Sequence, residues 1–312
     1  MIDVIGAPFD LCGKRLGSRL GPAAVRLAGL VEALEALELH VEDRGDVSVP
    51  SGEVCGCGLR NFQPLLDVVK DLRELVMTSL IGGRVPVVLG GEHSLAMAGI
   101  SAAIQHFEGD LGLLWIDAHA DINTPDTSDT GNIHGMPVAA LAGLPSGSEG
   151  QVDDEWRQLL GALDLSQKLD LEATVWYGLR DVDRAERPRL AGLPITMHDI
   201  DRHGVEAEVN RLCSWFDRSG VRQLWISFDV DALDPILAPG TGTGVRGGLT
   251  YREAHLTAEL IREALDARGC RFKLVGVDLV ETNPLYDSQN ETAKMSVEWL
   301  ASLFGKTILG TR

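Results

Sequence analysis

Short apolar runs of the kind that form buried strands recur along this chain, and segments with helical periodicity separate them. Buried strands that alternate with helices form a parallel sheet, because each crossover helix returns the chain to the end of the sheet where the previous strand began. We therefore predict an α/β protein with about eight parallel strands and helices on both faces. The expected strands are residues 3–7, 40–47, 85–89, 111–117, 174–179, 194–199, 223–230 and 273–281.

Five segments repeat apolar residues at intervals of three and four, the spacing of one helix face. Pro22 suits the first turn of a helix expected over residues 22–37. The last helix is expected to begin with Ser288-Gln-Asn-Glu291, which has the spacing of a capping box, and to stop at Gly305. The other expected helices span residues 60–81, 94–106 and 251–267.

The element pattern alone does not separate an open sheet from a closed (β/α) barrel, because eight strands suit both. We find no repeat or linker, so we expect one domain over residues 1–312, with residues 145–154 as a surface loop. In both architectures ligands bind at the carboxyl ends of the strands.

Charge and cysteine content narrow the class of protein. With 46 acidic and 28 basic residues the net charge is −18, which disfavours nucleic acid or an anionic membrane as a partner. No apolar stretch reaches the ~20 residues that span a bilayer, and no signal peptide is recognisable. Of the five cysteines only Cys55 and Cys57 are close in sequence, so we expect unpaired thiols in a cytoplasmic protein.

The apolar run at residues 111–116 ends in Asp117-Ala-His119-Ala-Asp121. Alternate residues of a strand face the same side, so these three side chains are expected to point together. A single Asp-x-His pair is more typical of a strand-end turn that a carboxylate caps. Three such residues after a buried strand indicate a cation site, because buried carboxylates must be paired or coordinate a metal.

Two other strands end in similar residues. Residues 223–228 lead into Asp229-Val-Asp231, and residues 85–89 lead into a glycine turn followed by His93. Alone, a histidine at the position of His93 is more often a helix cap or a packing residue. Together the three strand ends offer four carboxylates and two imidazoles, too many for one tetrahedral zinc but suited to two octahedral ions. The oxygen-rich set favours Mn²⁺, and two such ions activate water at neutral pH.

Several blocks of the sequence resemble those of the ureohydrolases, binuclear manganese enzymes that release urea or a related product from guanidino compounds. The loop INTPDTSDTGNIHGMP makes the chain similar to the arginases within this family, and the resemblance covers essentially the whole chain. It implies a three-layer α/β/α fold with an open parallel sheet, and assembly into homotrimers or homohexamers. The blocks are GGEHS (90–94), DAHADIN (117–123), GNIHG (131–135), SFDVDALDP (227–235) and GGLTYRE (247–253).

The resemblance implies two Mn²⁺ per chain and a hydroxide that bridges them. Asp117 and Asp229 would bind both ions, and Asp121 would also belong to the catalytic machinery. The ligands implied for one ion are His93, Asp117, Asp121 and Asp229, and those for the other are Asp117, His119, Asp229 and Asp231.

The resemblance also assigns residues to catalysis and to the substrate. His134 would transfer protons, a role that suits the pKa of histidine, and Glu281 would hold the guanidinium in a two-pronged grip. Without the resemblance, His134 would be as consistent with a surface loop and Glu281 with an ordinary strand-end acid.

The amino-acid end of the substrate would be recognised by a separate set of residues. Asn123, Thr130 and Asp183 fall where arginases hold the α-carboxylate and α-amino groups, and Thr243 lies in the TGTG loop, where it would contact the substrate or support the metal site.

Five positions depart from the family pattern or add charge to it. Glu92 replaces a frequent Asp, Gly244 a usual Pro, and Thr130 a common Ser, while Asp126 and Asp129 add acid to the loop. The added acid could shift the preference toward a more cationic substrate.

The sequence therefore predicts hydrolysis of L-arginine to L-ornithine and urea. One alternative is a ureohydrolase that acts on agmatine, guanidinobutyrate or a similar guanidino compound. Another is a non-catalytic, metal-dependent oligomer that binds arginine, which the complete set of ligands together with His134 and Glu281 argues against.

Overall fold

The computed structural model describes residues 1–50 and 58–311. Its central layer is one open parallel sheet. Residues 51–57, which include Cys55 and Cys57, and residue 312 lie outside the described residues. Every neighbouring pair of the eight strands is parallel, and β2 and β6 are the two edges, so the expected sheet is confirmed and the barrel is excluded. In spatial order the strands are β2 (Val41–Asp46), β1 (Ile2–Ala7), β3 (Val85–Gly90), β8 (Lys273–Val280), β7 (Gln223–Asp229), β4 (Gly112–Ile116), β5 (Thr174–Leu179) and β6 (Leu193–Thr196).

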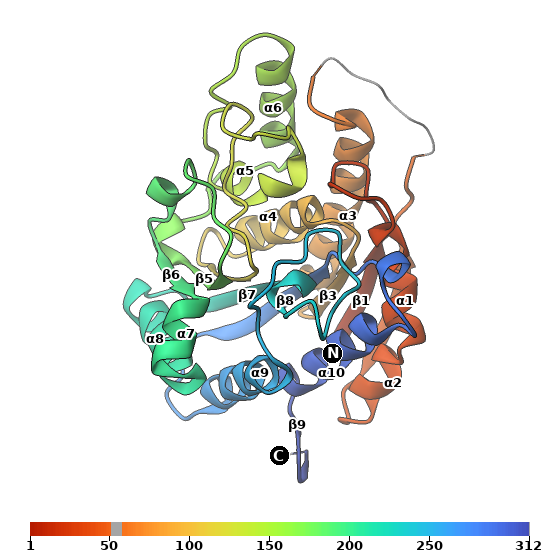
Figure 1. Ribbon diagram of the computed structural model, residues 1–312, viewed down its shortest axis with the longest axis vertical. Coiled ribbons are helices and arrows are strands. Elements are labelled where there is room, and N and C mark those ends of the chain that lie inside the picture. The colour runs from red at the N-terminus through yellow and green to blue at the C-terminus, as the bar shows by residue number, and fades with distance from the viewer. Residues whose placement is uncertain (51–57, 312) are drawn as a thin grey trace.

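Helices cover both faces of this sheet and complete three layers (Figure 1). On one face lie α3 (Phe62–Ile81), α4 (Ala96–His106), α5 (Pro137–Leu141) and α6 (Gln151–Ala162). On the other lie α1 (Gly21–Leu27), α2 (Leu30–Glu35), α7 (Met197–His203), α8 (Val205–Ser219), α9 (Tyr251–Asp266) and α10 (Glu291–Leu303). A short hairpin of β9 (Lys306–Thr307) and β10 (Gly310–Thr311) ends the described chain.

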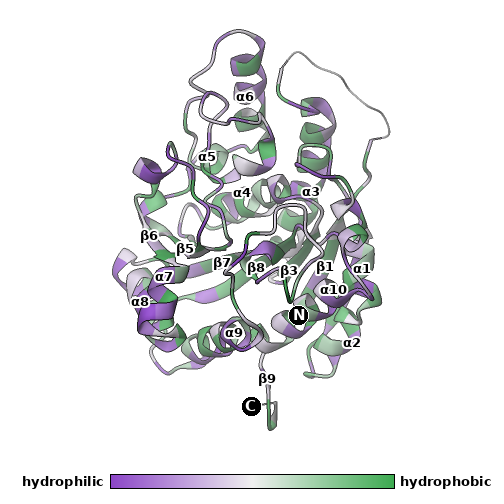
Figure 2. Ribbon diagram, in the orientation of Figure 1, coloured by the Kyte–Doolittle hydropathy of each residue, from purple (hydrophilic) through white to green (hydrophobic). Residues whose placement is uncertain are grey.

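Strand β4 shows why the central strands are apolar without alternation. Leu113 and Trp115 pack into the core under α3–α6, while Leu114 and Ile116 pack into the core on the opposite face, and all four are fully buried. Burial of a leucine or isoleucine side chain stabilises the fold by ~1.5–3 kcal/mol. Helices α8 and α9 carry both hydrophobic and hydrophilic residues, as expected where only one face is buried (Figure 2).

Besides the last helix, two expected elements differ from the observed ones by more than one or two residues. The helix expected over residues 22–37 is divided into α1 and α2, because Gly29 between them has a φ of 89°, in the left-handed region. The strand expected over residues 194–199 ends at Thr196, where a capping box between Thr196 and Asp199 begins α7.

The prediction of a capping box at the start of the last helix is wrong. Gln289 and Asn290 both have positive φ and separate Ser288 from the first turn of α10, which begins at Glu291. Asp287 takes the capping role, since its Oδ2 accepts a hydrogen bond from the Thr292 amide at 2.7 Å.

The sequence analysis did not predict four helices: α5, α6, α7 and α8. The signal was present in α8, whose buried residues Val205, Val209, Leu212 and Phe216 recur every three or four positions. Helix α6 begins inside the loop that was expected over residues 145–154.

The structure bears on the predictions about membrane-spanning segments and about the cysteine thiols. No described helix has the length and apolar composition needed to cross a membrane. Cys12, Cys213 and Cys270 are free thiols, as expected for these three positions.

Candidate metal centre and substrate cleft

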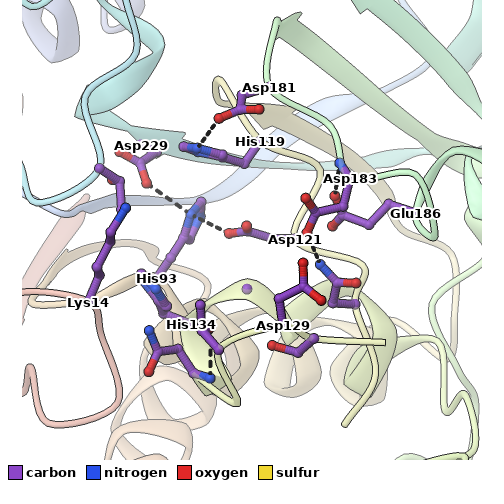
Figure 3. A pocket seen from close by; sticks show the side chains of 16 residues that line it. Lys14, His93, His119, Asp121, Asp129, His134, Asp181, Asp183, Glu186 and Asp229 are labelled. Atoms are coloured by element: carbon purple, nitrogen blue, oxygen red, sulfur yellow. Dashed lines mark hydrogen bonds and ion pairs between the residues drawn. The ribbon is translucent and has the colours of Figure 1, made fainter. Parts of the chain in front are cut away.

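A cleft of about 260 Å³ opens at the carboxyl end of the sheet (Figure 3). Strands β3, β8, β7 and β4 are neighbours, so the loops that follow them meet there. Three predicted residues, Asp117, Asp231 and Glu281, are buried and are not among the described residues that line the cleft. The predicted residues that do line it are His93, His119, Asp121, Asn123, Thr130, His134, Asp183, Asp229 and Thr243.

One group of predicted ligands converges on His93. The Nδ1 atom of His93 lies 3.0 Å from Asp117 Oδ2, 3.1 Å from Asp121 Oδ2 and 3.2 Å from Asp229 Oδ2. This nitrogen is buried and has no hydrogen-bond partner among the described residues. Three carboxylates and a buried imidazole that face one point form a donor set for a divalent cation.

A second group converges on His119 beside the first. The Nδ1 atom of His119 lies 3.1 Å from Asp231 Oδ2 and 3.3 Å from Asp117 Oδ1. Asp117 thus turns one oxygen to each group, which is the geometry of a bridging ligand. For Asp229, Oδ2 lies 3.2 Å from His93 Nδ1 and Oδ1 accepts a hydrogen bond from the Asp231 amide. Neither oxygen contacts His119 among the described residues, so its bridging role stays a prediction.

The electrostatics of the carboxylates also fit a cation. Burial, with the charge of Asp117 adding to it, raises the pKa of Asp121 to about 6. Burial together with the charges of Asp231 and Asp117 raises the pKa of Asp229 above its ordinary value. Carboxylates that are costly to ionise side by side are stabilised by a divalent cation between them.

The loop that carries Asp117, His119 and Asp121 does not have the conformation the sequence analysis assumed. Strand β4 ends at Ile116, and Asp121 has a φ of 49°, so the three residues are not alternate positions of one strand. Asp117 Oδ1 instead accepts a hydrogen bond from the His119 amide at 2.7 Å, which closes a tight turn. The side chains meet because the loop turns, so the prediction of a cluster holds although its geometric reason was wrong.

Buried polar residues behind His93 hold its ring in place. Trp115 stacks on the ring with centroids 4.0 Å apart, and Ser227 Oγ lies 2.9 Å from His93 Nε2. Ser227 donates to Asp278 Oδ1 at 2.6 Å, and Trp225 Nε1 donates to the other oxygen of Asp278. The sequence analysis missed these residues, although Ser227 and Asp278 stand out as polar positions within apolar strands.

His134 and Glu281 form a pair next to the metal ligands. His134 Nδ1 lies 3.1 Å from Glu281 Oε1, which also accepts a hydrogen bond from the His93 amide at 3.0 Å. Burial alone would lower the pKa of His134, but its hydrogen bond to Glu281 and the charge of Glu281 raise it to about 9. Both hydrogen bonds use Oε1 of Glu281. Glu281 has a φ of 61°, a strained conformation of the kind that is common at functional sites.

The opposite side of the cleft carries the residues expected to bind the amino-acid end of the substrate. Figure 3 shows Asp183 and Glu186 on this side, with His93 and Asp121 between them and Lys14. Asn123 Nδ2 donates to Asp183 Oδ2 at 2.8 Å. Glu186, which the sequence analysis missed, supports this region because its carboxylate accepts hydrogen bonds from the amides of Ile122 and Asp183.

The positions that depart from the family pattern fall in different places. Asp129 and Thr130 line the cleft, whereas Asp126 accepts a hydrogen bond from Thr124 and is not among its described lining residues. Glu92 is fully buried beside His93, and burial raises its pKa to about 8. Of the two added acids, Asp126 and Asp129, Asp129 is therefore the one that lines the cleft.

Comparison with known proteins identifies the family of this chain. A family model described as the Arginase family matches residues 1–305. The chain belongs to the arginase family. An arginase of Staphylococcus aureus is 40% identical over 317 residues, which cover 99% of this chain and 98% of that protein. The human mitochondrial arginase-2 is 40% identical over 98% of this chain and 85% of that protein.

Solved structures agree with this arginase-family assignment. The native arginase structure from Bacillus caldovelox matches with a TM-score of 0.88 and 37% identity, and the match covers 98% of this chain and 99% of that one. The arginase family is one of metal-dependent hydrolases, and the two groups of histidine and aspartate described above fit such a centre.

Proposed function

We propose that this arginase-family protein hydrolyses L-arginine to L-ornithine and urea. The observation that carries the proposal is the juxtaposition of the two ligand groups that share Asp117 with the His134–Glu281 pair. Arginases that align with nearly all of this chain support the same conclusion.

Two divalent cations, which we propose to be Mn²⁺, would be held by the two ligand groups. The first would be bound by His93, Asp117, Asp121 and Asp229, and the second by Asp117, His119, Asp229 and Asp231. When bound, the cations lower the pKa of water and stabilise the negative charge that develops as water adds to the guanidinium carbon. The preference for Mn²⁺ rests on the predominance of carboxylate oxygens.

The protein's own groups would bind the guanidinium and move protons. Glu281 attracts the guanidinium through its carboxylate and holds it above the ligand groups. His134, whose pKa the carboxylate of Glu281 raises, can donate its proton to the amine that leaves as ornithine.

Selectivity for arginine would come from the other side of the cleft. Asp183 is an acceptor for the α-ammonium group, while the amide of Asn123 and the hydroxyl of Thr130 are donors for the α-carboxylate. Agmatine lacks the carboxylate, so its binding would leave these donors unpaired. Assembly into trimers or hexamers and a cytoplasmic location remain part of the proposal and rest on the sequence.

A substrate panel tests this proposal. Urea release should be measured with L-arginine, agmatine and 4-guanidinobutyrate, with and without added Mn²⁺. We expect arginine to be the best substrate and Asp117→Asn to abolish turnover. Asp110→Asn, which alters a carboxylate that precedes β4 and pairs with Arg222, is the matched control and should remain active. An agmatine kcat/KM equal to or above that of arginine would refute the arginase assignment.

A further inference from the structure

Arg189 ties together two segments that border the substrate cleft. It ends the 3₁₀ helix Arg187–Arg189, in the segment after β5. Its guanidinium donates to three uncharged oxygens of the loop after β4: the carbonyl of Ile122 at 3.0 Å, Thr124 Oγ1 at 3.1 Å and Thr127 Oγ1 at 3.2 Å.

The hydrogen bonds that the hydroxyl of Thr127 accepts determine the direction in which it donates. A hydroxyl has one hydrogen to donate and two lone pairs that accept. The Thr127 oxygen accepts from Arg189 and from the Thr124 amide, at 3.2 Å and 2.9 Å, which fills both acceptor positions. Its one hydrogen therefore points to an acceptor. The nearest of the three available is Asn123 Oδ1 at 2.9 Å, whereas the carbonyl and Oγ1 of Thr124 both lie at 3.3 Å.

The hydroxyl of Thr127 in turn sets the orientation of the Asn123 amide. Because Oδ1 accepts from Thr127, the NH₂ group must lie on the other side, where one N–H donates to Asp183 at 2.8 Å. An amide nitrogen carries two N–H groups, so the second is left for an acceptor in the cleft that Asn123 lines. A flipped amide would instead turn a carbonyl oxygen toward Asp183 and toward any bound carboxylate.

We propose that Arg189 is a specificity-determining positioning residue, which acts through Thr127 to hold the Asn123 amide with its N–H toward the substrate α-carboxylate. The inference rests on the proposed function, because it assumes that an α-amino acid is the substrate. Arg189 lies outside the cleft lining among the described residues and was not singled out by the sequence, since its partners are over 60 positions away.

The proposal separates two kinds of ligand. Compounds with an α-carboxylate, such as L-arginine and the product L-ornithine, depend on the amide orientation. Agmatine has the same guanidinium but no carboxylate, so it does not depend on it. Loss of Arg189 should therefore weaken arginine and ornithine without changing the chemistry at His134 and Glu281.

Steady-state kinetics of Arg189→Met tests this separation. We expect the KM for arginine and the inhibition constant of ornithine to rise about tenfold, the loss typical of one charge-assisted hydrogen-bond network, with kcat within about twofold. The kinetics with agmatine and the metal content should not change. Arg189→Lys should recover part of the affinity, because an ammonium can still donate to Thr127.

Three further variants sharpen the interpretation. Thr127→Val should reproduce the rise in KM, whereas Thr127→Ser, which keeps the hydroxyl, should not. Arg187→Met is the matched control, since the guanidinium of this neighbouring arginine donates only to the Val182 carbonyl among the described residues, and the kinetics of this variant should stay normal. If Arg189→Met leaves the arginine KM unchanged, weakens arginine and agmatine equally, or loses metal, the inference is overturned. A wild-type protein without arginine turnover would instead refute the proposed function, and ornithine binding measured by calorimetry would then still test the role of Arg189.

Discussion

Asp117 and Asp229 make the same hydrogen bond at the ends of two neighbouring strands. In each case Oδ1 accepts from the backbone amide two residues later, His119 or Asp231, at 2.7 Å, and Oδ2 turns toward His93. In both carboxylates Oδ1 holds the turn and Oδ2 faces the first candidate metal position, and Oδ1 of Asp117 also lies 3.3 Å from His119 Nδ1 in the second ligand group. Structure and coordination are separable at these positions, because an asparagine can keep the turn while it loses the charge.

This separation leads to a prediction about metal content. Asp117→Asn should keep a native circular dichroism spectrum and lose both ions, since its oxygens face both ligand groups. Asp117→Ala should lose both ions and also stability, by ~1 kcal/mol for the lost turn bond. Elemental analysis and thermal unfolding measure the two effects. Retention of two ions in Asp117→Asn would show that the ligands are misassigned.

A second prediction concerns proton transfer. His134→Asn should lower kcat by about 10²–10⁴-fold while metal content is kept, because the ring contacts Glu281 and is not placed among the ligand groups. The measurement is kcat at saturating arginine together with metal analysis. A kcat within threefold of the wild-type value would remove His134 from the mechanism.

The pKa of His134 predicts a pH-dependent contribution to stability. Its pKa in the folded metal-free chain is raised to about 9, above the ordinary value near 6.5. A group with a raised folded pKa stabilises fully below its unfolded pKa and loses this contribution as the pH rises through the folded pKa. Metal-free protein should thus lose a few degrees of Tm between pH 6.5 and 9 relative to His134→Asn.

The same pair offers a spectroscopic check. Glu281→Gln should abolish turnover and lower the pKa of His134, since the hydrogen bond and charge of Glu281 raise it. The imidazole resonance of His134 in an NMR titration of metal-free protein reports this pKa directly. An unchanged titration curve in Glu281→Gln would contradict the pairing.

A fifth prediction tests the loop that departs from the family pattern. Thr130→Ser should change arginine kinetics little, because the hydroxyl is kept. Asp129→Ser should raise kcat/KM for arginine only if the acid of this loop biases the cleft against a carboxylate. Asp126→Asn is the matched control, because Asp126 binds Thr124 and is not among the described lining residues. An equal response of both variants would show that local charge in the cleft does not set the preference.

The amino-acid sequence by itself determined the α/β class with a parallel sheet and indicated a metal site, whereas the choice of an open three-layer sheet over a barrel came from the family resemblance. Fully apolar strands such as β4, separated by amphipathic segments, are stable only in a parallel sheet with both faces covered, so local pattern sufficed. Carboxylates and imidazoles placed directly after such strands indicated a metal centre, because buried carboxylates must be paired or coordinate a cation. The family resemblance added the roles of His134 and Glu281, which residue type alone left open.

Only the tertiary structure decided which groups touch. The strand order brings Glu281 against His134 across 147 positions, and the segment after β5 brings Arg189 to Thr127 across 62. The division of the first helix at Gly29 and the turn at Asp117 also depend on contacts and backbone angles that no periodicity encodes. Hydrogen bonds act over about 3 Å, and the distances between side chains from remote segments follow from packing of the whole sheet rather than from local sequence.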